Sequence, residues 1–366
     1  MPDLSLIVNT FQKPRHLALV LESIALQEAI RPERVEVIVS DDGSTDETAA
    51  IVEAFSARAA FPVRFVSHPH DGFRVAAVRN RGVRAAAGDY LLFLDGDCIL
   101  PRDHLAAYLE RRRPGVAHLG SCARLPKHVS ETLVPGGLAA ANFGAIVPPE
   151  ESRLLVRRHR KAWWHTLLRH PTKPRLIGNN FGVWRRDYET VNGFDERFVG
   201  WGQEDDDFGL RLRTAGVKLE SIVNRTFSMH VWHPIDGSAT PRWHDGVNVG
   251  YFLRRGRLTA CRDGLARRPA SAIRWGLPDD LAATALGRTI DGLLHDAQRA
   301  GRGEACEIDV VVRPGRSRFS RPAECRLLMV EGSTEAEAAL RRKADRIETF
   351  AAGDAAGVAA ILDAIG

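Results

Sequence analysis

The sequence has few of the features that mark an exported or membrane-spanning protein. Its five cysteines are scattered, odd in number and form no CxxC pair, which indicates neither a disulfide framework nor a zinc ribbon. No run of about 18 apolar residues is present, and the first residues, MPDLSLIVNTF, show neither the basic region nor the apolar core of a signal peptide. We therefore expect a cytoplasmic protein. A further expectation is peripheral contact of this protein with the inner face of the membrane.

The composition is that of an ordinary folded protein. Hydrophobic residues make up 44% and charged residues 27% of the 366 residues, which excludes wholesale disorder and collagen-like repetition. The length exceeds that of a typical single domain and predicts one large domain with an appended module. The net charge of +5 suits an anionic partner but is too small to identify one.

Short apolar segments alternate with helix-like segments over the first 100 residues. Strands are expected at residues 4–8, 35–40, 63–68 and 90–94, and helices at residues 17–27, 49–58 and 76–87. This alternation predicts an α/β fold with a doubly wound, mostly parallel sheet. Polar clusters follow each strand (NTFQK, DDGSTDE, HPHDGFR and DGD), and they should converge at the carboxyl edge where such sheets bind ligands.

The rest of the chain divides by composition. Residues 125–176 are expected to form an irregular basic insertion with some helix, since residues 153–175 carry eight basic residues and no acid. A second basic stretch, residues 251–275, has seven arginines against one aspartate. The sequence pattern changes after Pro278, which predicts a domain boundary near residue 277. We expect a helix over residues 281–299 and a small α/β appendage that continues to the end of the chain.

Two acidic clusters follow predicted strands. In SDDGSTDET, the carboxylates Asp41, Asp42 and Asp46 are suited to bind a base or ribose, or else simply to cap the next helix. Asp95 and Asp97, in LDGDC, are spaced to hold a divalent cation against a diphosphate, and the alternative is a solvated turn. Hard oxygen ligands favour Mg²⁺ or Mn²⁺ over zinc.

Two later segments carry further candidates. His230 is the expected completion of the oxygen-rich metal site, and His233 is the alternative, because MHVWHP leaves the register ambiguous. The segment WGQEDDDF places four acids beside Trp201, so that a carboxylate can act as general base near a sugar-binding tryptophan. The alternative is a charged helix N-terminus favoured by the helix dipole.

Taken in order, these motifs resemble a known family. SLIVNTF, VIVSDDGSTDET, RNRGVRAAAGDYLLFLDGDC and NNFGVWRRDYETVNGFDERFVGWGQEDDDFGLRLRTAG are similar to the inverting GT-A glycosyltransferases of family 2. The second half is similar to the galactosyltransferase-type C-terminal segment of chondroitin-polymerase-like enzymes. The resemblance covers roughly residues 3–235. It implies a GT-A domain over residues 1–277, with a nucleotide-binding half (1–100) and an acceptor-binding, catalytic half (101–277), followed by an accessory module of unknown role (278–366).

The resemblance also implies roles for individual residues. It makes Asp205 the catalytic base and Glu204 a ligand of acceptor or donor hydroxyls, with Asp97 and His230 (or His233) on the metal. The residues that it places around the nucleotide sugar are Thr10, Phe11, Asp42, Arg79, Asn80, Asp95, Asn179, Asn180 and Trp201. The family usually has glycine where Gln203 stands, a departure that bears on the acceptor pocket.

The function predicted from the sequence is metal-dependent, inverting transfer of a sugar from a nucleotide diphosphate sugar. The expected donor is a UDP-sugar, the cation Mn²⁺ or Mg²⁺, and the acceptor a hydroxyl of a glycan or a lipid-linked saccharide. Two alternatives stay open: a nucleotidyltransferase acting on sugar phosphates, although NTFQKPRH has no glycine-rich phosphate loop, and a non-catalytic glycan-binding protein. No nucleic-acid partner is expected. The basic stretches suit an acidic saccharide, a lipid-linked diphosphate or a membrane surface, and the C-terminal module suits docking or oligomerisation.

Overall fold

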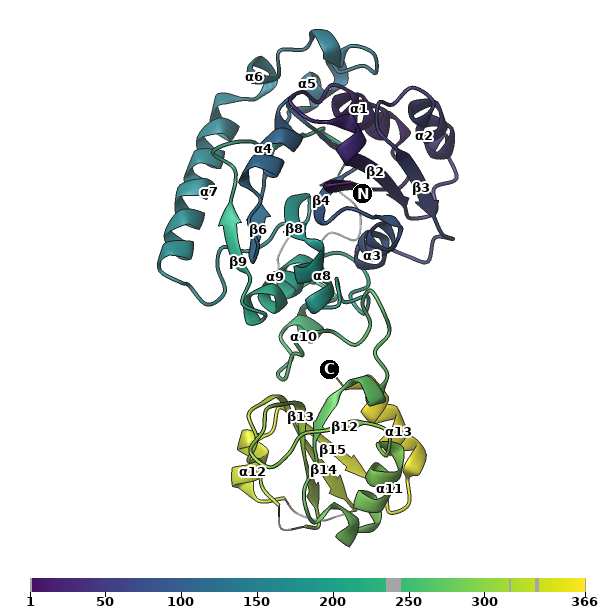
Figure 1. Ribbon diagram of the computed structural model, residues 1–366, viewed down its shortest axis with the longest axis vertical. Helices are drawn as coiled ribbons and strands as arrows, with labels where there is room; N and C mark the ends of the chain where they lie inside the picture. The colour runs from purple at the N-terminus through teal and green to yellow at the C-terminus, as the bar shows by residue number, and fades with distance from the viewer. Residues whose placement is uncertain (1, 235–244, 316, 333–335, 366) are drawn as a thin grey trace. The chain divides into compact units, whose positions relative to one another are not determined.

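The structure, a computed structural model, describes residues 2–234, 245–315, 317–332 and 336–365. Residues 235–244 of the predicted catalytic half therefore lie outside the described residues. The chain divides into two compact units, Met1–Phe252 and Leu253–Gly366 (Figure 1). This division precedes the expected boundary near residue 277, because Leu258, Ile273 and Trp275 are buried in the hydrophobic core of the second unit. Most of the second basic stretch thus belongs to the second unit.

The first unit is built on a seven-stranded sheet in the order β3-β2-β1-β4-β8-β6-β9. β8 runs antiparallel to both of its neighbours, and the other pairs are parallel. This confirms the α/β fold and the mostly parallel sheet. The strands are β1 (Leu4–Thr10), β2 (Val35–Asp41), β3 (Val63–Ser67), β4 (Tyr90–Asp95), β6 (Val116–Leu119), β8 (Asn180–Trp184) and β9 (Lys218–Ser221).

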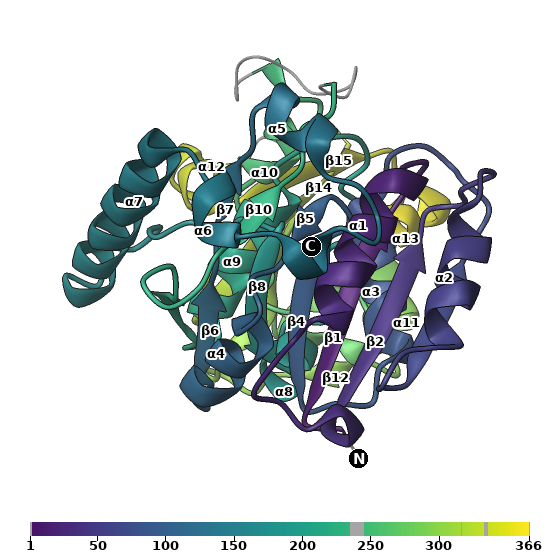
Figure 2. The same cartoon turned by 90° about the horizontal axis from the view of Figure 1, so that it is seen from above.

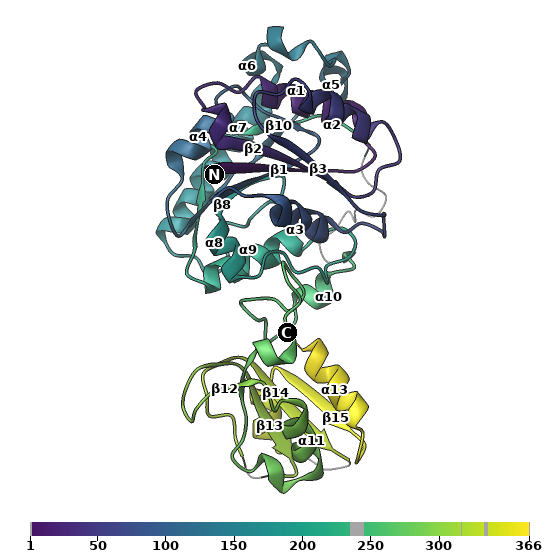
Figure 3. The same cartoon turned by 45° about the vertical axis from the view of Figure 1, so that its right-hand side comes forward.

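Helices lie on both faces of this sheet, as Figure 3 shows, with α1 and α2 on one face and α3, α8 and α9 on the other. Successive side chains of each strand point to opposite faces of the sheet. Leu92 and Leu94 pack in the core with α1, whereas Phe93 stacks on Phe181 on the opposite face, with ring centroids 4.5 Å apart. The helices of this unit are α1 (Pro14–Ala25), α2 (Thr48–Ser56), α3 (Val75–Ala85), α4 (His104–Arg111), α5 (Lys127–Thr132), α6 (Phe143–Ile146), α7 (Pro149–Leu167), α8 (Arg185–Thr190), α9 (Glu204–Thr214) and α10 (Val249–Phe252), with single 3₁₀ turns at Pro32–Arg34 and Leu138–Ala140.

A small second sheet lies beside the large one and carries part of the site. It consists of β5 (Cys98–Ile99), β10 (Ser228–His230) and β7 (Cys122–Arg124), with β10 in the middle. The antiparallel pairing of β10 with β5 sets His230 opposite Cys98, one residue after Asp97. A histidine and an aspartate that are far apart in the sequence are therefore neighbours.

The second unit has a parallel five-stranded sheet in the order β12-β11-β13-β14-β15. Its core joins Trp275 on β11 to apolar residues of β13, β14 and the last helix. The helix expected over residues 281–299 is instead a 3₁₀ turn, a shorter helix and an edge strand. The elements are β11 (Arg274–Gly276), α11 (Ala285–Leu293), β12 (Gln298–Arg299), β13 (Cys306–Arg313), β14 (Ala323–Glu331), α12 (Ala338–Lys343), β15 (Arg346–Phe350) and α13 (Ala355–Ala364), with 3₁₀ turns at Ala270–Ala272 and Leu281–Ala283.

Two helices of the first unit can be compared with the sequence prediction. The basic insertion contains α7, a helix of 19 residues that packs against β7 and β9 and lies at the edge of the unit in Figure 2. Helix α9 begins at Glu204, so the four acids of WGQEDDDF form its first turn, as in the alternative of a charged helix N-terminus. Within the described residues, no helix has the length and apolar character needed to cross a bilayer.

Candidate active site

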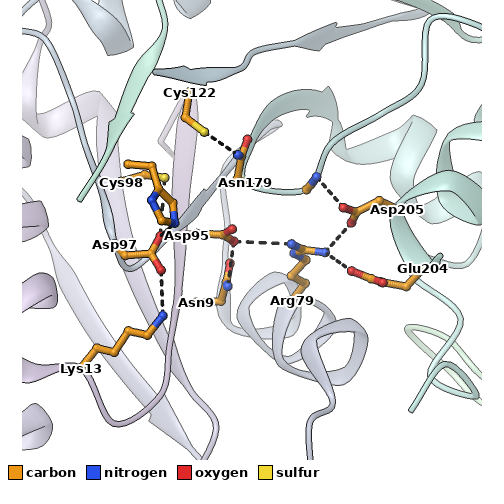
Figure 4. A network of polar contacts seen from close by, with 12 residues as sticks. Asn9, Lys13, Arg79, Asp95, Asp97, Cys98, Cys122, Asn179, Glu204 and Asp205 are labelled. Atoms are coloured by element: carbon orange, nitrogen blue, oxygen red, sulfur yellow. Dashed lines mark hydrogen bonds and ion pairs between the residues drawn. The ribbon is translucent and has the colours of Figure 1, made fainter. Parts of the chain in front are cut away.

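The candidate site lies where β1, β2 and β4 end and the antiparallel strand β8 begins. Register fixes this arrangement: Thr10 pairs with Asp41, Asn9 with Asp95, and Leu94 with Asn180. The loop before α9 brings Glu204 and Asp205 to the same edge (Figure 4). The expected convergence of the polar clusters is therefore present for these strands.

Arg79, on α3, is the centre of the polar network. Its guanidinium lies 2.7 Å from Asp205 Oδ1, 3.4 Å from Glu204 Oε1 and 3.5 Å from Asp95 Oδ1. Figure 4 shows Arg79 between Asp95 on one side and the two α9 carboxylates on the other. The arginine side chain is only 3% exposed, and it joins one carboxylate at the end of β4 to two carboxylates at the start of α9.

Asp205 is held from two sides. Its Oδ1 accepts the Arg79 hydrogen bond, and its Oδ2 accepts a 2.7 Å hydrogen bond from the backbone N–H of Gly178. A Cβ at position 178 would clash with both Arg79 and Asp205, so the close approach requires glycine. The side chain keeps 26% of its surface exposed, which leaves it accessible to a reacting hydroxyl.

Glu204 differs from its neighbour in environment. Its side chain is buried, and Oε2 has no hydrogen-bond partner among the described residues. Burial, reinforced by the nearby charge of Asp205, raises the pKa of Glu204, and the Arg79 charge only partly offsets this. A protonated Glu204 beside Asp205 can donate a hydrogen bond to a ligand hydroxyl.

The end of β2 forms a second part of the site. Asp42 is buried, with His68 Nε2 3.1 Å from Oδ1 and His70 Nδ1 3.3 Å from Oδ2. Burial raises the pKa of Asp42, and the two imidazoles act against that rise. Phe11 stacks on His70 with ring centroids 4.2 Å apart and planes 11° apart. A flat aromatic surface thus lies near a buried carboxylate, which suits a nucleobase.

Asp97, His230 and His233 form a candidate metal centre, with one ligand atom of each within 4.8 Å of the others. His233 Nε2 lies 3.1 Å from Asp97 Oδ2, and His230 Nε2 lies 3.6 Å from Oδ1. The structure therefore brings both histidines to the aspartate. A carboxylate oxygen with two imidazole nitrogens suits a divalent cation such as Mn²⁺.

A lysine ammonium already lies among these ligands. Lys13 Nζ is 2.9 Å from Asp97 Oδ2 and 2.9 Å from His233 Nε2. Burial alone would raise the pKa of Asp97, but the His233 hydrogen bond and the charges of His230 and Lys13 outweigh it and lower the pKa. The cluster thus attracts a cation, and its residues fit a divalent metal ion.

Two other predicted ligands, Thr10 and Asn179, each have a buried polar atom without a hydrogen-bond partner within the described ranges. Thr10 Oγ1 and Asn179 Oδ1 have no hydrogen-bond partner in the described part of the chain, although both are buried. The Asn179 backbone oxygen accepts a 3.2 Å hydrogen bond from Asp95 N, which fixes it at the site. Buried polar atoms normally have partners, so a bound donor is a reasonable source of the missing hydrogen bonds.

The two remaining asparagines lie deeper, with both side chains fully buried. Asn80 donates to the backbone oxygen of Phe194 at 2.8 Å and accepts from Tyr188, while Asn180 accepts from Tyr108 at 2.9 Å. Their amides therefore position the surrounding loops, and donor contact by either stays a prediction. Trp201, 40% exposed, lies in the loop before α9.

Sequence reasoning assigned no role to Asn9, Lys13, His68, His70 and Gly178. Asn9 donates to Asp95 Oδ1 at 3.0 Å, and the others make the contacts given above. Four of them lie in the polar clusters NTFQK and HPHDGFR, so their position after strands was the available signal. Gly178 carries no such signal, because its importance comes from its distance to Asp205.

Comparison with known proteins finds similarity to two protein families. Residues 5–117 match the model of glycosyl transferase family 2, and residues 165–233 match that described as the N-terminal domain of galactosyltransferase. Validoxylamine A glucosyltransferase of Streptomyces hygroscopicus subsp. limoneus is 31% identical over 60% of this chain and 49% of its own length. Chondroitin synthase of Escherichia coli is 26% identical over 60% of this chain and 33% of that protein.

Among solved structures, the mannosyltransferase PcManGT of Pyrobaculum calidifontis has a TM-score of 0.46 and 20% identity, covering 65% of this chain and 59% of that one. The chain matches about half the length of the validoxylamine A glucosyltransferases and a third of the E. coli synthase. The two family matches follow each other in the first unit and span the residues of the candidate site. Over residues 5–117, the first unit is therefore similar to glycosyl transferase family 2.

Proposed function

We propose that the first unit is a metal-dependent, inverting glycosyltransferase that moves a sugar from a nucleotide diphosphate sugar to a hydroxyl group. The observation that carries this proposal is the Arg79 network, which joins Asp95 at the end of β4 to Glu204 and Asp205 at the start of α9. It links the side of the site that suits a nucleotide to two carboxylates that suit proton transfer.

On the donor side, we assign the nucleobase to Asp42 and the Phe11–His70 stack, with Thr10 beside them. A uridine nucleotide is our expectation for the base. Asp95 and Asn179 lie between that stack and α9 along the sheet edge, where the ribose, diphosphate and sugar would follow. The unpartnered atoms of Thr10 and Asn179 support a polar ligand along this line.

The leaving diphosphate needs positive charge. Asp97, His230 and His233 would hold the cation, with Mn²⁺ or Mg²⁺ as the expected ion. When bound, such an ion neutralises charge that develops on the phosphate oxygens. Lys13 is a cation of the chain itself at the same place, and its ammonium can contact phosphate once it leaves Asp97.

The transfer step needs a base for the acceptor hydroxyl, and we assign this role to Asp205. Its carboxylate removes the hydroxyl proton while the acceptor oxygen forms a bond to the anomeric carbon. The bond from that carbon to the diphosphate oxygen breaks, and its electrons leave with the nucleoside diphosphate. Attack from the face opposite the leaving group inverts the anomeric configuration. Arg79 and Gly178 hold Asp205 in place for this step.

The residues named above do not determine the acceptor or the linkage that is formed. As the acceptor we propose a glycan or a lipid-linked saccharide. A GalNAc(5)-diNAcBac-PP-undecaprenol beta-1,3-glucosyltransferase of Campylobacter jejuni is 30% identical over 33% of this chain. For the second unit we propose an accessory role in docking or oligomerisation, which is supported by its separate hydrophobic core.

The test is a donor screen with Mn²⁺ that measures release of nucleoside diphosphate from a panel of nucleotide sugars. Asp205→Asn should lower transfer at least about 100-fold, the scale of general base catalysis, while donor binding persists. Asp206→Asn is the matched control, since Asp206 is the next residue and pairs with Arg175 at 3.2 Å instead. Near wild-type transfer by Asp205→Asn would refute the base assignment, and release of pyrophosphate from a nucleoside triphosphate would favour a nucleotidyltransferase.

A further inference from the structure

Helix α7 has an outward face that combines large apolar side chains with positive charge. Trp163 and Trp164 are 51% and 52% exposed, and Leu168, directly after the helix, is 72% exposed. Val156 and Leu167 are exposed on the same helix. We propose that this face docks on an anionic phospholipid bilayer.

The orientation of α7 is fixed by its opposite face. Leu155 is buried there, and His159 Nδ1 and Ser221 Oγ lie 3.0 Å apart. Thr166 donates a hydrogen bond to the backbone oxygen of Leu219 at 2.9 Å, so the helix is attached to β9 over several turns. At 3.6 residues per turn, residues 156, 160, 163, 164 and 167 then share the side that points away from the sheet.

The charge on this face is of one sign. Arg153, Arg157, Arg160 and Lys161 are exposed, and within the described residues no ion pair joins any of them to a carboxylate. The acids Glu150 and Glu151 are confined to the first turn, where they complement the helix dipole, at the end opposite the tryptophans. An anionic surface is therefore the complementary partner.

The exposed apolar residues of α7 distinguish between the possible anionic partners. A polyanion such as an acidic glycan can pair with arginine and lysine but offers no hydrocarbon to Leu167 and Leu168. A bilayer interface accepts both, because indole rings lie at headgroup depth and lysine and arginine contact anionic lipid. The chain runs on from α7 to Gly178 and Asn179, so docking would also hold one wall of the candidate site near the membrane.

Vesicle co-sedimentation of the full chain tests this inference. The vesicles contain either phosphatidylcholine alone or equal parts of phosphatidylcholine and phosphatidylglycerol. We expect binding to the anionic vesicles that falls with salt, and little binding to the neutral ones. Arg157→Gln with Arg160→Gln should weaken it roughly 25-fold, since each basic residue near an anionic surface contributes about a fivefold factor. Trp163→Ser with Trp164→Ser should weaken it at least about tenfold.

One control is matched in charge, and the other removes an exposed apolar side chain from a different helix. Arg342→Gln with Lys343→Gln removes two exposed charges from α12, and Leu293→Ser removes an exposed apolar side chain from α11, so both should bind as the wild type does. Quenching of tryptophan fluorescence by brominated lipid should be lost in the double tryptophan variant. Because the replaced α7 side chains are exposed, the unfolding temperature should not change.

Three results would overturn the inference. The first is no binding to anionic vesicles, and the second is wild-type binding by both α7 variants. The third is that only the charge variant binds more weakly, while an acidic polysaccharide retains the protein as well as the anionic vesicles do. The last outcome would identify a general polyanion surface. The vesicle assay contains no nucleotide-sugar donor, so a negative result there would not contradict the proposed transfer reaction. A negative donor screen would likewise not contradict membrane docking.

Discussion

Replacement of Arg79 by methionine removes a buried cation from among three carboxylates. Methionine keeps much of the apolar volume of the arginine stem but leaves Asp95, Glu204 and Asp205 without their shared positive charge. Removal of one partner from a buried ion pair costs about 3–5 kcal/mol. Asp95 and Asp205 keep 28% and 26% of their side-chain surface exposed, so water compensates in part and we expect a loss of about 3 kcal/mol.

The loss should depend on pH. Burial raises the pKa of Asp95 and of Glu204, and the charge of Arg79 acts against that rise. Without the arginine, the folded state holds protons on these two groups more tightly than the unfolded chain does. Such groups stabilise the fold fully below their unfolded pKa of about 4, and this contribution is lost as pH rises. The free energy of unfolding of Arg79→Met should therefore fall further below that of the wild type at pH 8 than at pH 5.

Urea unfolding followed by tryptophan fluorescence measures this difference, with hydrogen exchange of peptides from β1 and β4 to assign the transition of the first unit. Arg84→Met is the matched control on the same helix, because Arg84 forms a more exposed ion pair with Glu196 at 2.8 Å. It should cost less than about 1 kcal/mol. Equal, pH-independent losses in the two variants would refute the idea that Arg79 organises the site.

Three further predictions concern neighbouring residues. Burial raises the pKa of Glu204 to about 8 from an unfolded value near 4.5, so its stabilising contribution is lost as pH rises through that window. Glu204→Gln should reduce the pH dependence of the free energy of unfolding by ~5 kcal/mol across the window, and an unchanged pH dependence would contradict this. Lys13→Met removes the ammonium that competes with the metal ion and should increase the affinity for Mn²⁺, measured by calorimetry, about fivefold. An unchanged affinity would show that Lys13 does not compete, and Lys127→Met is the control. Gly178→Ala should displace Arg79 or Asp205 and lower transfer at least about tenfold with little change in nucleotide affinity, and wild-type transfer would argue against the close approach.

The part of the fold with regular β-α alternation was predictable from the sequence. The first four predicted strands and three helices agree with the structure to within a few residues, because apolar periodicity fixes buried faces. The same reasoning was wrong over residues 281–299, where helix-like spacing extends across α11 into the edge strand β12. It was also wrong about the boundary near residue 277, since pairing of β11 with β13 is a long-range contact that local composition does not express.

The site was predictable where its residues follow strands. Asp42, Asp95 and Asp97 could be placed on one edge from topology alone, whereas the proximity of Lys13 to Asp97 and His233 depends on how loops far apart in the sequence approach each other. Asn80 and Asn180 illustrate the opposite difficulty. A motif identifies them, but their full burial and protein partners can be seen only in three dimensions.

Gln203 shows how the site overrides local preference. It has φ +71° between Gly202, at φ +95°, and the first residue of α9, and glutamine in this left-handed region costs about 1 kcal/mol that glycine would avoid. The backbone turn is nevertheless required, because it starts α9 with Glu204 and Asp205 directed at Arg79. The contacts of Arg79 and Gly178 with those carboxylates stabilise the turn from outside the loop, so a residue that is locally unfavourable is tolerated. Local strain and the proposed catalytic carboxylates therefore occur at adjacent residues for one physical reason.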